Sequence, residues 1–187
     1  MGLPYSRDRT YVPWPDAASE VSSENLNNLQ DEIIYGRAAV RRVNQASPTI
    51  AVGESVDLSA GFLFDVGGFT DREATIQGGT SMPRGGLYRV QFQIYGTTSG
   101  PGTEAKVELR QMTMPGGGVI TLGDDFFSAA HDNKLSIAGV GYVEIPEGEH
   151  LNRIIYIANT SSSGGAGDWA TQGGFIAFEQ IAGVGAP

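Results

Sequence analysis

The strict alternation of apolar and mostly polar residues between Tyr88 and Tyr95 limits the possible folds of this chain more than any other feature of its sequence. Every second residue is apolar and faces one way: Tyr88, Val90, Phe92 and Ile94. The residues between them face the other way: Arg89, Gln91, Gln93 and Tyr95. A period of two is typical of a β-strand with one face in a core and the other in solvent. The sequence therefore predicts a half-buried strand here.

Similar strands and glycine-rich turns fill the chain from residue 48 onward. Residues 105–110, 153–159 and 175–182 are the clearest further strands. Turn-forming clusters such as GGFTD, MPRGG and MPGGG lie between the strands. No segment with the length and periodicity of a helix interrupts them. This order predicts an all-β, antiparallel sandwich or barrel.

Glycine content and charge divide the chain near residue 47. Only two of the 27 glycines, Gly2 and Gly36, come before this point. The formal net charge of the chain is −9, and nearly all of the acidic excess comes after it. We therefore predict three segments: an extended arm over residues 1–20, an amphipathic helix over 21–46 and a β-domain over 47–187.

The arm is predicted to be extended because Pro4, Pro13 and Pro15 each block helix continuation. Aromatic and basic side chains suited to attachment are unusually frequent in it: Tyr5, Arg7, Arg9, Tyr11 and Trp14. Two interpretations remain open at this point. The arm either folds back on its own domain or docks on another protein.

The helix is predicted over residues 24–43, after a capping serine at Ser22 or Ser23. Apolar residues recur at alternating spacings of three and four, with Gly36 at one core position: Leu26, Leu29, Ile33, Val40 and Val43. This is the heptad pattern of a coiled coil, and in its register Glu32 and Arg37 would pair between parallel neighbouring chains. We predict that these residues drive self-association. The alternative is a single helix that lies on its own domain with the same stripe.

Several kinds of chemistry find no support in the composition. The chain has no cysteine, so it has no disulfide, no thiolate zinc site and no cysteine nucleophile. The acidic net charge argues against nucleic acid as a partner, and no apolar run is long enough to cross a membrane. The two histidines, His131 and His150, lack a metal-ligand spacing, and no phosphate loop or nucleophile elbow occurs. We therefore predict that the protein is not an enzyme and holds no cofactor.

The longest predicted loop, residues 161–174, contains Trp169. An exposed tryptophan at a loop tip could contact a sugar or a protein partner. The same side chain could instead plug the mouth of the barrel. The sequence leaves both possibilities open.

The strand GLYRVQFQIYG, residues 86–96, resembles a strand of the C1q/TNF-like jelly-roll domains. Residues 105–111, 145–159 and 175–181 resemble later strands of that family in the same order, so the resemblance covers about residues 48–182. It implies a ten-stranded jelly roll that assembles as a parallel trimer, with the helix as a trimerising stalk or anchor. By analogy with that family, a calcium ion on the trimer axis or in a loop is an alternative to solvated acidic loops.

The front of the chain is similar to the start of many tailed-phage fibre and appendage proteins. In those proteins an extended segment with a tryptophan precedes a helix with an L-N-x-(L/I)-E/D-x-x-I pattern. Here YVPWPD, residues 11–16, precedes LNNLQD, residues 26–31. Joined to a trimeric jelly roll, this likeness implies a protein of the virion surface.

We therefore expect a homotrimeric structural protein of a tailed bacteriophage, a capsid decoration or head-fibre protein on the capsid exterior. Its arm would bind the major capsid protein or another virion protein. Five apolar residues are expected in the core or in the trimer contact: Tyr88, Val90, Phe92, Phe175 and Phe178. The alternative is a receptor-binding, lectin-like tip of a tail fibre, in which a loop with Trp169 recognises a host-surface glycan or protein.

Overall fold

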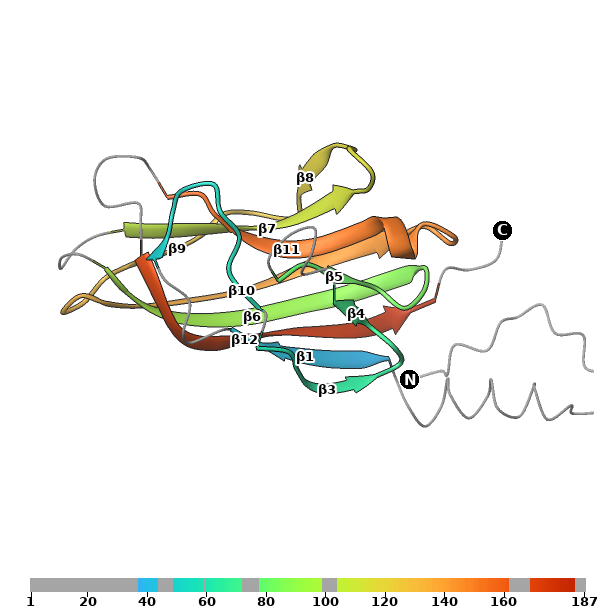
Figure 1. The fold of residues 1–187 in the computed structure, drawn as a ribbon, viewed down its shortest axis with the longest axis horizontal. Coiled ribbons are helices and arrows are strands. Elements are labelled where there is room, and N and C mark those ends of the chain that lie inside the picture. The colour runs from blue at the N-terminus through green and yellow to red at the C-terminus, as the bar shows by residue number, and fades with distance from the viewer. Residues whose placement is uncertain are drawn as a thin grey trace, which may run out of the picture.

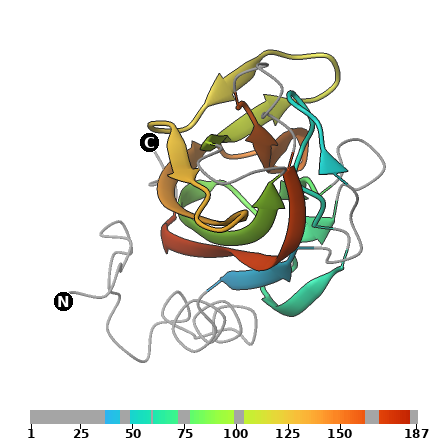
Figure 2. The ribbon, with the colours of Figure 1, turned by 90° about the vertical axis from the view of Figure 1, so that its left-hand side faces the viewer.

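The computed structural model describes residues 37–43, 49–58, 60–71, 78–98, 104–161 and 169–183. They form a sandwich of two antiparallel sheets, seen from the side in Figure 1 and from one end in Figure 2. The prediction of an all-β, antiparallel jelly roll is confirmed. The predicted arm and the helix up to residue 36 lie outside the described residues.

The first sheet has the strand order β10-β6-β12-β1-β3, and β2 also pairs with β12. Its strands are β1 (Ala38–Arg42), β2 (Thr49–Ile50), β3 (Phe62–Val66), β6 (Gly86–Thr98), β10 (Lys134–Ile145) and β12 (Trp169–Ala182). The second sheet has the order β4-β5-β11-β7-β8, and β9 also pairs with β7. Its strands are β4 (Thr70–Asp71), β5 (Thr80–Ser81), β7 (Glu104–Thr113), β8 (Val119–Thr121), β9 (Phe126–Ala129) and β11 (Arg153–Asn159). One turn of 3-10 helix, η2 (His150–Asn152), precedes β11.

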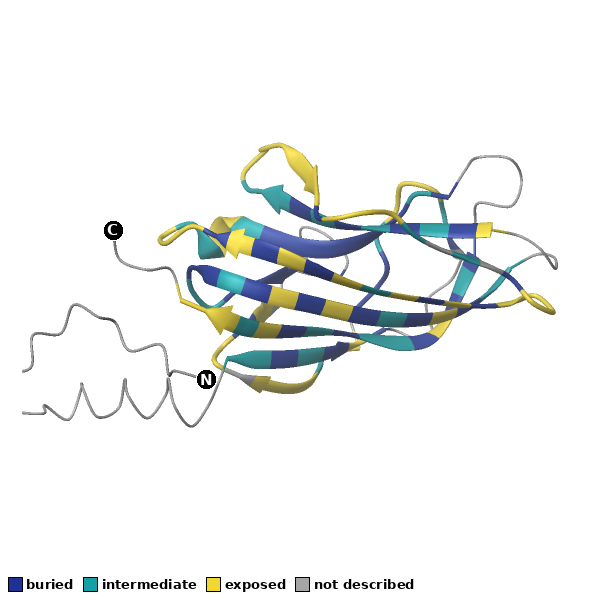
Figure 3. Cartoon of the chain, turned by 180° about the vertical axis from the view of Figure 1, so that it is seen from behind, coloured by how far each residue is buried: buried dark blue, intermediate teal, exposed yellow. Residues whose placement is uncertain are grey.

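The alternating pattern of β6 determines which of its side chains enter the core. Its apolar residues Tyr88, Val90, Phe92 and Ile94 are buried between the sheets, and Arg89, Gln91 and Tyr95 are exposed. Figure 3 shows this alternation along the long strands. Opposite them, the second sheet contributes buried residues from β7 and β11: Val107, Leu109, Ile155 and Ile157. Each such aliphatic side chain gains about 1.5–3 kcal/mol by leaving water, which makes this layer the main source of stability.

The prediction of a helix that continues to residue 43 is wrong, because Ala38–Arg42 form strand β1. β1 lies between β12 and β3, so both of its edges form hydrogen-bonded ladders. Its burial follows a period of two, with Ala39 and Arg41 inside, and Val43 just beyond its end is also in the core. The β-branched valines suit a strand, and pairing on two edges outweighs the weak helical spacing. The β-domain therefore begins no later than Arg37, rather than at residue 47.

The chain enters and leaves the sandwich at one end. Ala38, the first residue of β1, pairs with Glu179 near the end of β12. In Figure 1 this end, which we call the entry end, lies on the right. Any segment that precedes Arg37 therefore joins the domain at the entry end.

Tyr88 gives the domain a pH-dependent stability at high pH. Its side chain is fully buried, and its hydroxyl donates a hydrogen bond to the Arg84 carbonyl oxygen at 2.9 Å. Burial raises the pKa of Tyr88 from 10.0 to about 12. The folded state therefore retains this proton between pH 10 and 12, while the unfolded chain releases it. The stability that Tyr88 contributes is complete below pH 10 and is lost as the pH rises to about 12.

We expect the free energy of unfolding to fall across that pH range, measured by chemical denaturation. A Tyr88→Phe variant lacks the ionising group and should show a shallower decline. Equal slopes for the two proteins would contradict this role of Tyr88.

Candidate self-association face

The outward side of the first sheet carries several large exposed apolar side chains, and we call it the self-association face. Strand register places its residues in rows that cross the sheet. The middle row contains Val140, Gln91, Ala177, Val40 and Phe64. The row nearer the entry end contains Tyr142, Arg89, Glu179 and Ala38. The row on the other side contains Ala138, Gln93, Phe175 and Arg42.

Large apolar side chains of this face are unusually exposed for a monomer. Tyr142 is 56% exposed, Leu63 49% and Phe64 47%, and Val140 and Tyr95 are exposed to a similar degree. Phe175, Ala177 and Val40 lie between them and are half-buried. Scattered single apolar residues on a surface need no explanation, but a contiguous group marks an interaction site.

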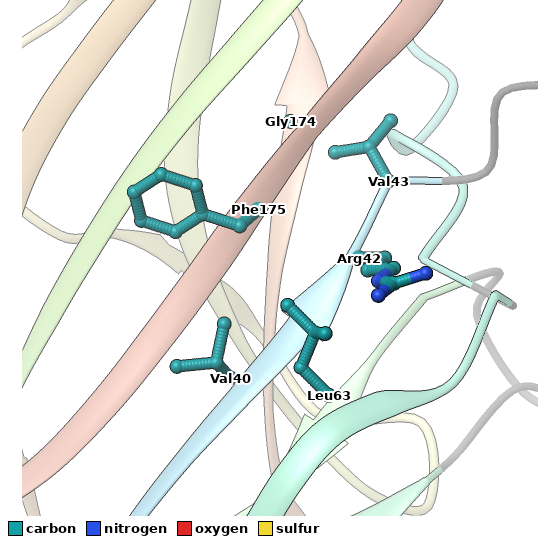
Figure 4. A pocket seen from close by; sticks show the side chains of 6 residues that line it. All are labelled: Val40, Arg42, Val43, Leu63, Gly174 and Phe175. Carbon is teal, nitrogen blue, oxygen red and sulfur yellow. The ribbon is translucent and has the colours of Figure 1, made fainter.

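A bulge in β12 forms a groove in this face. The pairing of β12 with β6 shifts between Thr171 and Gly173, and Gly174 adopts a φ of +134°. Beside the bulge is a groove of about 400 Å³, shown in Figure 4 and lined by Val40, Arg42, Val43, Leu63, Gly174 and Phe175. Apart from Arg42, its lining side chains are apolar. The groove therefore suits an apolar side chain from a partner.

An ion pair interrupts the apolar surface. Arg89 on β6 and Glu179 on β12 are directly opposite each other, and Nη2 and Oε2 are 2.5 Å apart. Both side chains are about half exposed. The pair makes this part of the face polar but leaves it without net charge.

The predicted core and contact residues separate onto two sides of the first sheet. Tyr88, Val90, Phe92 and Phe178 are buried in the core. Phe175 is on the outward side, in the groove, and so is a contact candidate.

The predicted helix residues that the structure describes have other roles than coiled-coil contacts. Val43 is buried in the core, and Val40 is on the self-association face. Arg37 donates a hydrogen bond to the Gly67 carbonyl oxygen at 3.2 Å. The other predicted helix and attachment residues lie outside the described part of the chain: Leu26, Leu29, Glu32, Ile33, Tyr5, Arg7, Arg9, Tyr11 and Trp14.

The expectation that Trp169 belongs to an exposed ligand loop is wrong. Trp169 is the first residue of β12, where it pairs with Thr98 and Ile50, and its side chain is buried. A Cβ placed at Gly96 would lie 2.8 Å from the indole ring, so the glycine leaves the space that this ring fills. Trp169 instead belongs to the hydrophobic core, where burying so large an apolar surface is favoured over leaving it at a loop tip.

The sequence analysis did not single out Leu63, Phe64, Val140 or Tyr142 as contact residues. β10 carried a signal, because its inward residues Leu135, Ile137, Val143 and Ile145 alternate with outward residues that include the apolar Val140 and Tyr142. A strand with apolar residues on both faces is covered on both faces. For β3 there was no such signal, because a strand of five residues with adjacent Phe62, Leu63 and Phe64 does not reveal its outward side.

The described part of the chain has neither a cluster of side chains that could hold a metal ion nor a helix that could span a membrane. No cluster of three histidine or carboxylate side chains occurs there, and His131 and Asp132 are an exposed pair. In those residues no helix has the length and apolar character of a membrane span.

Comparisons with known proteins show a shared fold. No family model matches the chain, and no curated protein matches its sequence. Solved structures do match. The globular domain of zebrafish complement 1qA is 14% identical with a TM-score of 0.56, over 78% of this chain and 97% of that one. Eiger TNF from S. frugiperda is 14% identical with a TM-score of 0.57, over 81% and 96%. Murine APRIL at pH 5.0 is 14% identical with a TM-score of 0.54, over 78% and 100%. The chain therefore has a C1q/TNF-like fold.

Proposed function

We propose that this C1q/TNF-like jelly roll is a homotrimeric structural protein of a tailed-phage virion, a decoration or head-fibre protein that binds and is displayed rather than catalyses. The observation that carries the proposal is the self-association face. A soluble monomer has no reason to expose Tyr142, Leu63, Phe64 and Val140 on one side of a sheet. The fold's resemblance to trimeric C1q/TNF-like domains identifies a second copy as the natural cover.

The positions of the exposed apolar residues favour a ring over a dimer. Besides the face, the edge strand β8 exposes Val119 and Ile120. β9, which also pairs with β7 on that edge, packs close to β10, the edge strand of the first sheet. The closeness is seen at Gly139 of β10, where an added Cβ would lie 2.5 Å from the ring of Phe126 on β9. An edge of one copy against the face of the next is a heterologous contact. Such contacts repeat around an axis, and they close into a ring of three when each copy is rotated by a third of a turn from the last.

The entry end supports a role as an anchored, displayed module. In a parallel trimer, all three chains enter at the same end, so three arms would leave the assembly together. Arms that carry Tyr5, Arg7, Arg9, Tyr11 and Trp14 would bind the particle. Three linked weak contacts strengthen attachment by orders of magnitude through effective concentration.

The decoration role is favoured over the receptor-binding tip. The tip hypothesis placed an exposed Trp169 in a ligand loop, and this side chain is buried. The two roles also differ in copy number, which quantitative mass spectrometry of purified particles would measure. Decoration predicts tens to hundreds of copies per particle, and a tail tip predicts only a few.

The first test is the native mass, by light scattering behind size exclusion. We expect about 59 kDa for the full chain, three times its 19.7 kDa. A truncated chain must begin at Arg37, because a start at residue 47 would remove β1. If the truncated chain is also a trimer, the jelly roll itself trimerises. If both chains are monomers, the proposed function is wrong.

An Ala177→Arg variant tests whether the face makes the contact. Ala177 is in the middle row, between Gln91 and Val40, so a charged side chain there would be buried by a second copy. We place this substitution in the truncated chain that begins at Arg37. The concentration at which half of the chains are dissociated should be about a hundredfold higher than for the truncated chain without the substitution. The circular dichroism spectrum should be unchanged. Thr70→Arg is the control and should remain a trimer, because Thr70 is exposed on β4, at the opposite edge of the second sheet from β8. A trimeric Ala177→Arg variant would exclude this face.

A further inference from the structure

We propose that the Arg89–Glu179 ion pair is a specificity element of the self-association face, which accepts a second copy when the two charges balance and resists one when a single charge is left without its partner. This inference rests on the proposed function. It concerns two residues to which the sequence analysis gave no role.

The pair lies within the face rather than at its rim. The two residues are cross-strand partners on β6 and β12, the second and third strands of a sheet that has five in its main path. In the same row, Tyr142 flanks Arg89 and Ala38 flanks Glu179. A second copy that covers Tyr142 and the middle row would also cover the pair.

The neighbouring row contains no charge that could replace either partner. Val140, Gln91, Ala177, Val40 and Phe64 are all uncharged. If Glu179 were neutral, Arg89 would lose its cross-strand partner. Glu144, the carboxylate on the outward side of β10, lies one row nearer the entry end, opposite Leu87.

The pair has a different energetic effect in the monomer and in the assembly. In the monomer both side chains are about half exposed, so water screens them and the pair contributes little to folding. In the assembly both charges lose their water. An intact pair enters as a neutral, hydrogen-bonded unit, whereas a single charge is left buried without compensation. Removing one partner should therefore weaken assembly much more than it weakens folding.

The second sheet offers a matched control. Arg153 on β11 and Glu149 also form a partly exposed ion pair, and β7 separates β11 from the edge strands β8 and β9. Their side chains are 22% and 47% exposed, compared with 45% and 50% for the pair on the face. This pair is neither on the self-association face nor on the edge strands that are proposed to meet it. Its loss should leave assembly unchanged.

The experiment uses the full chain and measures two quantities for each variant. Sedimentation over a dilution series gives the concentration at which half of the chains are assembled. Denaturation of the dilute, dissociated chain gives folding stability. The variants are Arg89→Gln, Glu179→Gln, the double variant, and the control variants Arg153→Gln and Glu149→Gln.

We expect each single variant on the face to raise the half-assembly concentration at least tenfold, with unchanged folding stability. The double variant leaves two neutral amides and should return to within about threefold of the wild type. The control variants should assemble like the wild type. Single variants that also assemble like the wild type would overturn the inference, as would a double variant as weak as the two singles combined. A wild-type chain that never assembles would instead overturn the proposed function.

Discussion

A Gly174→Ala variant is expected to lose about 4 kcal/mol or more of its free energy of unfolding, a large part of the roughly 5–15 kcal/mol that stabilises a typical domain. Gly174 has a φ of +134°, a conformation that residues with a Cβ rarely adopt. An added Cβ would also lie 2.2 Å from the Gln93 carbonyl oxygen and 2.8 Å from the Ile94 Cα. Both atoms belong to the backbone of β6, so they cannot move without disturbing the central pairing of the first sheet.

Chemical denaturation monitored by tryptophan fluorescence would measure this loss, since Trp169 is buried at the start of the same strand. Gly118→Ala is the matched control. Gly118 has open space around its Cβ position and no positive φ, so its unfolding free energy should change by less than about 0.5 kcal/mol. A Gly174→Ala protein as stable as the Gly118→Ala protein would show that β12 does not need this bulge.

Replacing Arg41 with methionine is expected to lower the free energy of unfolding by about 3 kcal/mol. Arg41 points into the sandwich from β1, and its side chain is fully buried. Its guanidinium donates hydrogen bonds to the Leu58 carbonyl oxygen at 2.8 Å and the Gly79 carbonyl oxygen at 3.0 Å. It also donates to Thr80 Oγ1 at 2.9 Å and lies 5.0 Å from the centre of the Phe62 ring. One side chain thus joins β1 and β3 of the first sheet to β5 of the second.

The expected loss for Arg41 is a difference between two opposing effects. Methionine would leave three buried acceptors without this donor, and hydrogen bonds from a charged donor are worth about 1.5–3 kcal/mol each. Methionine would also remove the unfavourable burial of a charge, which offsets part of the loss. An Arg41→Lys variant keeps the charge but cannot reach all three acceptors, so it should also be destabilised.

Arg42→Met is the control for Arg41, because it makes the same substitution one residue later on the exposed side of β1. Its unfolding free energy, measured on the dissociated chain, should change by less than about 0.5 kcal/mol. If Arg41→Met proves more stable than the wild type, the burial of the charge outweighs its hydrogen bonds. The link that Arg41 makes between the two sheets would then be unnecessary for stability.

The sequence by itself determined the fold class and the sides of the central strand. Side chains alternate across a strand, so Tyr88, Val90 and Phe92 had to face the core together and Arg89 and Gln91 had to face away. Glycine-rich turns between such strands leave few architectures other than an antiparallel sandwich. These conclusions needed no knowledge of neighbouring strands, because the pattern is local.

Only the tertiary structure decided the parts that depend on partners distant in sequence. Residues 38–42 became a strand because β12 and β3 supply hydrogen-bond partners on both edges, and a spacing of valines cannot reveal those partners. Trp169 became a core residue because Gly96, 73 positions earlier, leaves room for its ring. The self-association face likewise exists only once register aligns β10, β6, β12, β1 and β3. Burial and pairing are properties of the assembled sheet, and a local pattern specifies only which faces a strand can offer.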